Sequence, residues 1–386
     1  MRILLFTGKG GVGKTTVAAA TAAVAAASGR RTIVCSTDPA HSLADAFDVP
    51  LGDAPAQIAP RLWGQQLNAR TRFEEAWDDV RSYVVDVLDW AGAGAVEAEE
   101  LAVVPGLDEV FALADIKQFA TSGDYDVVVV DCAPTAETIR LLSLPDVLGW
   151  YMDRVFDTQR RLTRIVRPVL DRLTDVPIAG DGVFAAIRRF YERLDGVREL
   201  LGDGAVTTAR LVVNPERMVV AEARRTYTYL SLFGYHVDAV VANRMLPAGV
   251  EDPFFTAWKA TQSAHLDRIE EAFAPLPVLT AELAGGELVG LDALDGFGRS
   301  LYGALDPVAR LALVEPFRVD AVGDSLVLSV HLPFTARDEV ELGCNGDELL
   351  LAVGPHRRAL VLPDSLARRE VTGARLAGDR LEVEFA

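Results

Sequence analysis

The apolar residues of the chain fall into two patterns. Short, nearly continuous runs occupy residues 3–6, 32–35 and 127–130, and longer stretches of helical spacing lie between them, such as the Ala-rich segment 17–27. Parallel strands that are buried on both faces give continuous apolar runs, whereas amphipathic helices repeat every three or four residues. The order of the two patterns predicts an α/β protein whose central sheet is mostly parallel.

The same alternation continues through residue 304. Runs rich in β-branched residues are typical of strands, and periodic stretches that follow them are typical of the connecting helices. We expect further strands at 62–68, 210–216, 237–242 and from Pro277, and further helices near 77–88, from 105, and at 218–233, 252–273 and 291–304.

Between residues 145 and 201 the strand pattern stops and amphipathic helices replace it. Two apolar stripes lie on either side of the Pro- and Gly-containing break 177–182. We therefore expect a helical insertion at about 145–205. Its stripes either pack within the protomer or form a groove for an apolar client helix, and the sequence leaves both alternatives open. A Met-rich adaptable groove is disfavoured, because the chain has only 4 methionines.

After Pro307 the period of the pattern changes to two. Apolar residues alternate with polar ones at 326–330 and 349–353, and turn pairs such as Asn345-Gly346 separate the runs. This pattern predicts a small all-β sandwich of about 70 residues, a size at which domains fold on their own.

Length and composition fit a globular protein of more than one domain. The 386 residues divide at the change of pattern into an α/β domain at 1–307 and a β-sandwich at 314–386. The formal net charge of -18 argues against nonspecific binding to nucleic acid or to anionic membranes. Three scattered cysteines predict neither a disulfide framework nor a zinc site. With no signal peptide or membrane-spanning run in view, we expect a cytoplasmic protein.

The stretch 8–16, GKGGVGKTT, is the clearest chemical signal in the chain. It lies between a strand and a helix, which is the context of a phosphate-binding loop, and its glycines let backbone N–H groups surround an anion. Lys14 is placed to reach the β- and γ-phosphates of a nucleotide, and Thr15 to ligate Mg²⁺. The residues expected to bind ATP are Gly8, Lys9, Gly10, Gly11, Val12, Gly13, Lys14, Thr15 and Thr16.

Three polar residues end or follow predicted strands, and the carboxyl ends of parallel strands form the ligand-binding edge of such a sheet. Asp38 is the candidate for orienting or deprotonating the attacking water. Asp131 is the candidate for holding Mg²⁺ together with Thr15. Asn243 can pair with adenine, although an asparagine can also end a strand for turn reasons.

Five ordered motifs resemble the arsenite-pump ATPase and tail-anchored-protein targeting ATPase family. They are GKGGVGKTT at 8–16, DPAHS at 38–42, PGLDE at 105–109, DCAPT at 131–135 and VVANRMLP at 240–247. The resemblance implies a homodimer of doubly wound P-loop NTPase domains, each with an inserted helical subdomain, closing around two nucleotides. The C-terminal segment is similar to a small heat-shock (α-crystallin) domain through the pattern A-x-x-x-G-x-x-L-x-V at 374–383.

The resemblance also implies roles for single residues. Lys9 is similar to the signature lysine of deviant Walker A loops, which crosses to the nucleotide of the partner subunit and is catalytic with Lys14. From the loop alone, Lys9 can equally be a solvated lysine. Asp38 resembles the catalytic switch I carboxylate, Asp131 the switch II aspartate and Asn243 the adenine-binding residue of the family.

The chain also departs from this family. Ala136-Glu137 follows Thr135 where Gly-His is usual, and neither the zinc cysteines of the targeting factors nor the arsenite-binding cysteines of the pumps are present. Because the chain has one P-loop, a homodimer must supply the second.

We expect an ATP-hydrolysing homodimeric switch that acts on a hydrophobic client or membrane partner, and no nucleic-acid partner. The alternatives are an arsenite-efflux pump ATPase subunit, and a chaperone-like module that holds clients and uses hydrolysis as a timer.

Overall fold

An eight-stranded sheet in the order β3-β4-β2-β5-β1-β6-β7-β8 forms the centre of the protein. The structure, a computed structural model, describes residues 1–38, 42–66, 107–135, 138–139, 141–143, 188, 192 and 194–386. Neighbouring strands of the sheet are parallel, except that β3 and β4 are antiparallel. The strands are β1 (Arg2–Thr7), β2 (Thr32–Ser36), β3 (Ala56–Ala59), β4 (Leu62–Gln66), β5 (Val127–Asp131), β6 (Thr207–Val213), β7 (Val237–Met245) and β8 (Val278–Glu282).

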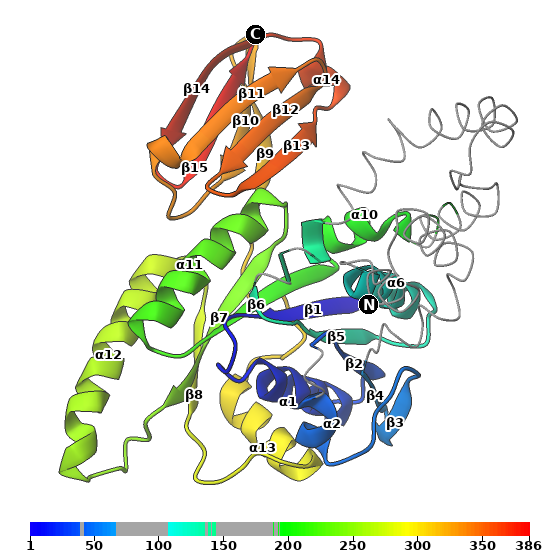
Figure 1. Cartoon of the computed structure of the whole chain (residues 1–386), viewed down its shortest axis with the longest axis vertical. Helices are drawn as coiled ribbons and strands as arrows, with labels where there is room; N and C mark the ends of the chain where they lie inside the picture. Colours follow the sequence, from blue (N-terminus) through cyan, green and yellow to red (C-terminus); the bar gives the residue numbers. More distant parts are fainter. Residues whose placement is uncertain are drawn as a thin grey trace, which may run out of the picture.

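Helices cover both faces of this sheet, as Figure 1 shows. On one side lie α1 (Lys14–Ala27), α2 (Ser42–Phe47) and α13 (Leu291–Tyr302). On the other lie α6 (Leu107–Thr121), α10 (Val197–Gly202), α11 (Arg217–Leu232) and α12 (Pro253–Phe273). The predicted α/β fold with a mostly parallel, doubly wound sheet is therefore confirmed.

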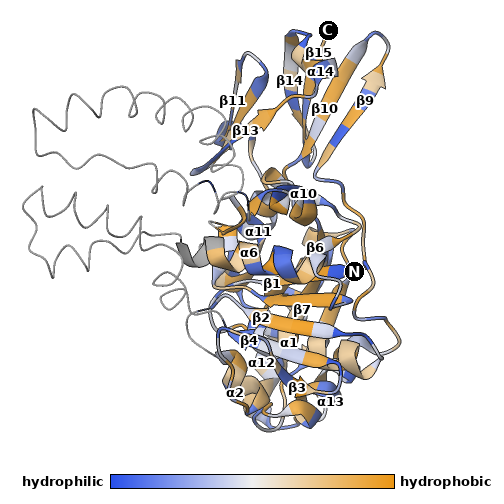
Figure 2. Ribbon diagram, turned by 90° about the vertical axis from the view of Figure 1, so that its right-hand side faces the viewer, coloured by the Kyte–Doolittle hydropathy of each residue, from blue (hydrophilic) through white to orange (hydrophobic). Residues whose placement is uncertain are grey.

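The central strands are buried as their composition predicts. All four valines of β5 and the residues Ile3 and Leu4 of β1 have no exposed surface. Figure 2 shows the apolar residues concentrated along these strands. Because each sheet face is covered by helices, both sides of every central strand must be apolar, which explains the continuous runs in the sequence.

Several predicted elements lie outside the described residues. The helices at 77–88 are not described, and of the insertion at about 145–205 only residues 188, 192 and 194–205 are, including the short α10. The predicted strand at 62–68 is described as β4, which ends at Gln66. The helix expected from residue 105 is α6, which the structure describes from Leu107.

The C-terminal region forms two antiparallel sheets, in the orders β14-β15-β10-β9 and β11-β12-β13. Apolar side chains from both sheets form one buried cluster, and the predicted small β-sandwich is confirmed. The predicted turns are also present, with Gly323 and Gly346 at φ values of 62° and 63° that favour glycine. The strands are β9 (Phe317–Val322), β10 (Ser325–His331), β11 (Val340–Asn345), β12 (Glu348–Val353), β13 (His356–Val361), β14 (Val371–Ala377) and β15 (Arg380–Phe385).

The β-sandwich packs against the C-terminal half of α11. Leu232 of α11 belongs to the buried cluster of the sandwich. Arg358 donates a hydrogen bond from Nη1 to the Leu232 carbonyl at 2.7 Å, and its guanidinium lies 5.0 Å from the ring centroid of Phe317. The hydroxyl oxygen of Ser231 lies 3.2 Å from Nδ1 of His331, at hydrogen-bond distance. The contact combines apolar burial with directional polar bonds, which fix the orientation of the sandwich on the helix.

This contact is expected to weaken in acid. His331 is 3% exposed, and burial lowers its pKa, although Asp379 at 3.0 Å from Nε2 opposes the shift and Arg380 reinforces it. A folded pKa below the ordinary value of about 6.5 means that the contribution of this group is complete above that pH and is lost as pH falls through the folded value.

Proteolytic cleavage between α13 and β9, measured from pH 8 to pH 5, should therefore accelerate at the acid end. In a His331→Gln variant, which cannot be protonated, the rate should depend less on pH. If the cleavage rates of the two proteins depend equally on pH, protonation of His331 does not weaken the contact.

Candidate functional site

The loop between β1 and α1 has the shape of a phosphate cradle. A Cβ at Gly8 would lie against the Val212 carbonyl, and one at Gly13, where φ is 94°, against the Asn243 amide, so both positions require glycine. Around Gly10 and Gly11 nothing lies within 4 Å of a Cβ position, so the outer side of the loop is open. No side chain caps the N-terminus of α1. The free N–H groups of its first turn and the positive end of its dipole therefore face the loop.

The two lysines of the loop are placed differently. Lys14 is 6% exposed, and its Nζ donates a hydrogen bond to the backbone carbonyl of Lys9 at 3.3 Å. The ammonium group thus folds back over the loop, at the position from which it can reach a phosphate. The side chain of Lys9 is half-buried, and no hydrogen bond or ion pair holds it within the described residues.

Asp131 ends β5 and is completely buried next to the loop. Its Oδ2 accepts hydrogen bonds from the Thr15 hydroxyl at 2.8 Å and the Ser36 hydroxyl at 3.0 Å. Its Oδ1 is buried without a hydrogen-bond partner. Burial raises the pKa of the carboxyl to about 6, against the opposing effects of the two hydroxyls and Lys14, and Asp38 raises it further. The site therefore holds a buried carboxylate with one oxygen that accepts no hydrogen bond, close enough to Lys14 for its charge to lower the pKa of the carboxyl.

The ends of β2 and β5 are tied together. The backbone N–H of Asp38 donates to the Ser36 hydroxyl at 3.2 Å, and the N–H of Ala133 donates to the Thr37 hydroxyl at 3.1 Å. Beyond β5, Thr135 has a buried hydroxyl without a partner. The structure thus brings Asp38, Asp131 and Thr15 to one edge of the sheet, beside the loop.

Asn243 lies beneath the loop rather than free at the sheet edge. It is 5% exposed, its Nδ2 donates to the Val12 carbonyl at 2.8 Å, and its Oδ1 accepts from the N–H of Arg244 at 2.9 Å. Each polar atom of the amide thus makes one hydrogen bond, which leaves one N–H of Nδ2 and one lone pair of Oδ1 for a further partner.

Sequence reasoning missed two hydroxyl residues of the site. Ser36 bonds Asp131, and Thr37 bonds the segment after β5, because β2 pairs with β5 with Ser36 opposite Asp131. The sequence shows two hydroxyl residues, Ser36 and Thr37, at the end of a buried strand. Only the strand order shows that this strand end lies beside the end of β5. Asn214, at the end of β6, is another buried polar residue whose Oδ1 has no partner.

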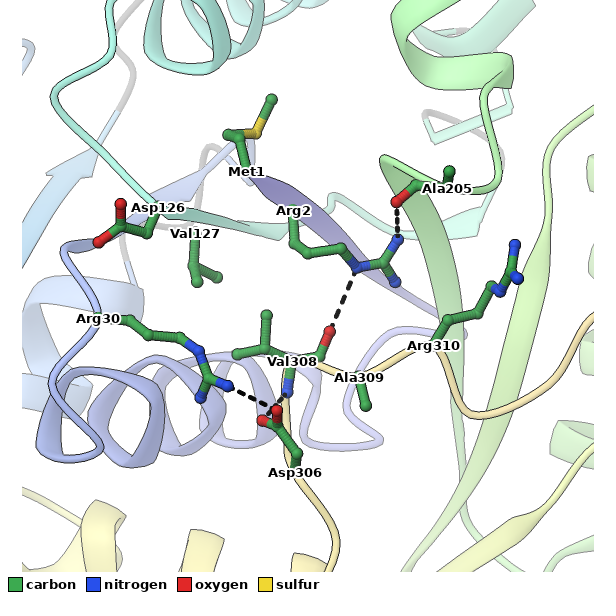
Figure 3. Close-up of a pocket in the computed structure, with 10 residues that line it drawn as sticks. All are labelled: Met1, Arg2, Arg30, Asp126, Val127, Ala205, Asp306, Val308, Ala309 and Arg310. Atoms are coloured by element: carbon green, nitrogen blue, oxygen red, sulfur yellow. Dashed lines mark hydrogen bonds and ion pairs between the residues drawn. The ribbon is translucent and has the colours of Figure 1, made fainter.

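Another cavity lies at the opposite edge of the sheet, by the amino ends of β1 and β5 (Figure 3). It measures about 540 Å³, and its arginines are already bonded. Arg2 donates to the carbonyls of Val308 at 3.2 Å and Ala205 at 3.0 Å, and Arg30 pairs with Asp306 at 2.5 Å. These bonds hold the segment after α13 against the sheet, so we assign the cavity a structural role.

The part of the chain that the structure describes offers few candidate ligands for a metal. No group of three or more His, Cys, Asp or Glu side chains that could hold a metal occurs in these ranges. Among the helices of the same ranges, none is both long and apolar enough to cross a membrane. A metal at the loop would therefore depend on few protein ligands, with phosphate and water completing its shell.

Comparison with known proteins agrees with this geometry. Residues 1–303 match the family described as anion-transporting ATPase, and residues 323–385 match an HSP20-like domain found in ArsA. A putative arsenical pump-driving ATPase of Chlorobaculum tepidum is 37% identical over 100% of this chain and 96% of its own length. One from Aquifex aeolicus is 35% identical over 99% of both chains.

A plant relative carries a different name. ATPase GET3B of Arabidopsis thaliana is 33% identical over 76% of this chain and 77% of its own length. The P-loop geometry, the match over residues 1–303 and the full-length bacterial relatives lead to one conclusion: this chain is an ATPase that belongs to the ArsA-type anion-transporting ATPase family, with a C-terminal HSP20-like domain.

Proposed function

We propose that the protein is a Mg²⁺-dependent homodimeric switch, in which ATP binding closes the dimer and hydrolysis reopens it, acting on a hydrophobic client or a membrane-protein partner. The observation that carries the nucleotide part is the buried Asp131 beside Thr15, with one carboxylate oxygen left without a partner. The dimer is supported by the resemblance of the loop to deviant Walker A loops, whose signature lysine reaches a partner subunit, and a second copy of the chain would supply the second loop.

The donor set fits Mg²⁺. The Thr15 hydroxyl and the Asp131 carboxylate are hard oxygen ligands 2.8 Å apart, and Oδ1 of Asp131 is the orphaned acceptor that a hydrated cation would satisfy. Bound there, Mg²⁺ would neutralise charge on the β- and γ-phosphates. Ser36 would keep the carboxylate in place while the Thr15 hydroxyl turns from Asp131 toward the metal.

The phosphates would be bound by the loop itself. The uncapped first turn of α1 and the open side of Gly10 and Gly11 provide N–H donors, and Lys14 provides a positive charge. Each N–H bond to a charged oxygen is worth about 1.5–3 kcal/mol, so a few of them suffice for micromolar affinity. Thr135, with its buried free hydroxyl, is an added candidate for contact near the γ-phosphate.

For the adenine, Asn243 remains our proposed contact. Its amide bonds Val12 and Arg244 and keeps a second N–H and a second lone pair, which are the donor and acceptor that adenine would need.

Asp38 is proposed to position the attacking water. It follows Ser36 by two residues and is close enough to Asp131 to raise the pKa of that carboxyl. Replacing Asp38 with Asn should lower the ATPase rate by about 10²–10⁴-fold while ATP still binds, because the water loses its base. Size-exclusion chromatography with ATP should then show a persistent dimer. Asp124→Asn, at an exposed position on the opposite edge, is the matched control; hydrolysis as fast in Asp38→Asn as in this control would exclude Asp38 from catalysis.

The arsenite-pump alternative is favoured by the names of the bacterial relatives, but the thiols of this chain oppose it. Cys35 and Cys132 are fully buried, and burial raises the pKa of both, that of Cys132 to about 12. Arsenite binds accessible thiolates, and only Cys344 is exposed. We therefore propose that arsenite does not stimulate hydrolysis. A dose-dependent rise in ATPase rate with arsenite would favour the arsenite-pump function over the client-directed switch.

We further propose the domain division at 1–307 and 314–386, and a cytoplasmic location. Two separate buried apolar clusters support the division, with the exception of Leu232, which joins the C-terminal cluster. Three free cysteines support a reducing compartment.

A further inference from the structure

A second cavity lies between α11 and α12, which run beside each other on one face of the sheet (Figure 1). Its volume is about 390 Å³. We call it the arginine groove, and the lining residues that matter here are Arg217, Arg224, Arg225, His265, Arg268 and Phe334.

Helical periodicity explains why these side chains converge. On α11, Arg217 and Arg224 are seven residues apart and thus lie on the same face, with Arg225 at its margin. On α12, His265 and Arg268 are three residues apart and therefore adjacent on the helix surface. The two faces meet at the groove, so the positive charges of both helices share one site.

The arginines of the groove lack acidic partners among the described residues. None of its four arginines forms an ion pair or a hydrogen bond within the described residues, although the chain carries a net charge of -18. Other arginines of the chain are paired, such as Arg299 with Asp295 at 2.6 Å and Arg318 with Asp320 at 2.5 Å. Gathering like charges without counter-ions is unfavourable, and an anion in the groove would remove this cost.

Arg224 is the most constrained of the four. Its Nε is buried without a hydrogen-bond partner, and its guanidinium lies 5.1 Å from the ring centroid of Phe334. Phe334 has a φ of 62°, which is rare for an aromatic residue, and it comes from the segment that follows β10 in the β-sandwich. Stacking on one face of the guanidinium leaves its N–H edge available for an oxyanion.

We propose that the arginine groove binds a small phosphate-bearing anion. Four guanidinium groups fit a multiply charged oxyanion, since each can donate two parallel hydrogen bonds to it. A volume of about 390 Å³ is that of a small-ligand pocket. An acidic peptide offers carboxylates singly and needs a longer surface than this cavity provides. The anion would join α11, α12 and the β-sandwich at Phe334, and would therefore fasten the sandwich to the ATPase domain.

The test is a calorimetric titration with inorganic pyrophosphate, without divalent cations, on the full chain carrying Lys14→Ala. This background removes the cationic phosphate contact of the P-loop, and the groove variants then separate binding at the groove from any that remains at the loop, independently of the proposed ATPase mechanism. Adding Arg224→Gln and Arg268→Gln should weaken binding by about 100-fold, through loss of two bidentate donors. Adding Arg224→Lys and Arg268→Lys, which keep the charge but lose the bidentate hydrogen bonds of the guanidinium, should weaken pyrophosphate binding less.

Arg299→Gln with Arg318→Gln is the matched control, because it removes the same charge from paired, exposed arginines. This pair should change the affinity by less than about twofold, consistent with little effect of distant screened charges. Each variant is used only if its thermal unfolding matches that of the background. Absence of pyrophosphate binding, equal weakening by the control pair, or tighter binding of a polyglutamate peptide than of pyrophosphate would each overturn the proposal.

Discussion

Replacing Asp131 with Asn is expected to abolish Mg²⁺-dependent hydrolysis and to stabilise the nucleotide-free protein. The carboxyl is buried, and its pKa is raised to about 6, so holding it ionised at pH 7 costs about 3 kcal/mol relative to the ordinary value near 3.9. An asparagine removes this cost and keeps an oxygen for Thr15 and Ser36. Its amide N–H₂ then occupies the place of the unpartnered Oδ1, and this buried donor without a partner reduces the stabilisation by about 1–2 kcal/mol.

The stability difference should depend on pH with a defined sign. Because the folded pKa is above the unfolded one, the wild type gains stability as pH falls through about 6 toward the unfolded value, and the variant does not. The unfolding temperature of Asp131→Asn should therefore exceed that of the wild type by about 2–4 °C at pH 8, and the difference should shrink by pH 5.

A matched control lies at the other end of the same strand. Asp126 has its pKa lowered to about 2 by hydrogen bonds from Arg31, so Asp126→Asn should destabilise the protein at pH 7. ATP with Mg²⁺ should raise the unfolding temperature of the wild type and of this control more than that of Asp131→Asn, which binds the phosphates at the loop but has lost the proposed metal ligand. If Asp131→Asn lowers stability at pH 8, or retains Mg²⁺-dependent turnover, the assignment of Asp131 is wrong.

Removing the ammonium of Lys9 should lower ATP turnover by about 10³-fold or more, if this group acts on the nucleotide of the partner as an arginine finger does. The substitution Lys9→Ala is structurally mild. Within the described residues of its own protomer, Lys9 contributes a backbone carbonyl that accepts a hydrogen bond from Lys14, and alanine keeps that carbonyl. The protomer should therefore fold and bind ATP normally.

Mixing two inactive variants separates action in trans from action in cis. A Lys9→Ala protomer keeps its own Lys14, and a Lys14→Ala partner keeps its own Lys9, so a mixed dimer contains one complete site. An equal mixture should recover about a quarter of the wild-type rate, since half of the dimers are mixed and each has one working site. No recovery on mixing would exclude action across the dimer.

Lys259→Ala controls for loss of a lysine elsewhere. The ammonium of Lys259 donates to the carbonyls of Ala248 and Val250, away from the P-loop, so its loss should spare turnover. A fall in turnover as large as that of Lys9→Ala would show that the assay responds to lysine loss in general.

The sequence predicted those parts of the fold that local pattern controls. The valine run of β5 and the loop at Gly8 each specify their own conformation, one by burial on both faces and the other by backbone contacts that admit only glycine. Strand order is not local. Without it, Ser36 could not be placed opposite Asp131, although both ends of the pair were visible in the sequence.

Polar residues with buried roles were the main omissions. Arg358 and His331 occur in strands whose alternation is typical of a half-exposed sheet, yet both are nearly buried against α11. Asn243 was predicted at the correct edge, but its contact with Val12 depends on the close approach of β7 to the loop. In each case the partner is distant in the sequence, so the pattern around the residue carries no sign of it.

The docking of the β-sandwich on Leu232 has a consequence for fragments of this protein. Separating the sandwich from the rest of the protein, with the chain cut between α13 and β9, would expose the apolar surface that packs on this leucine, together with the partly buried ring of Phe317. An exposed apolar surface of this kind binds the apolar segments of unfolded polypeptides. An excised sandwich would thus suppress the aggregation of other proteins even if the intact molecule never does so, whereas a sandwich expressed with α11 attached would keep that surface covered.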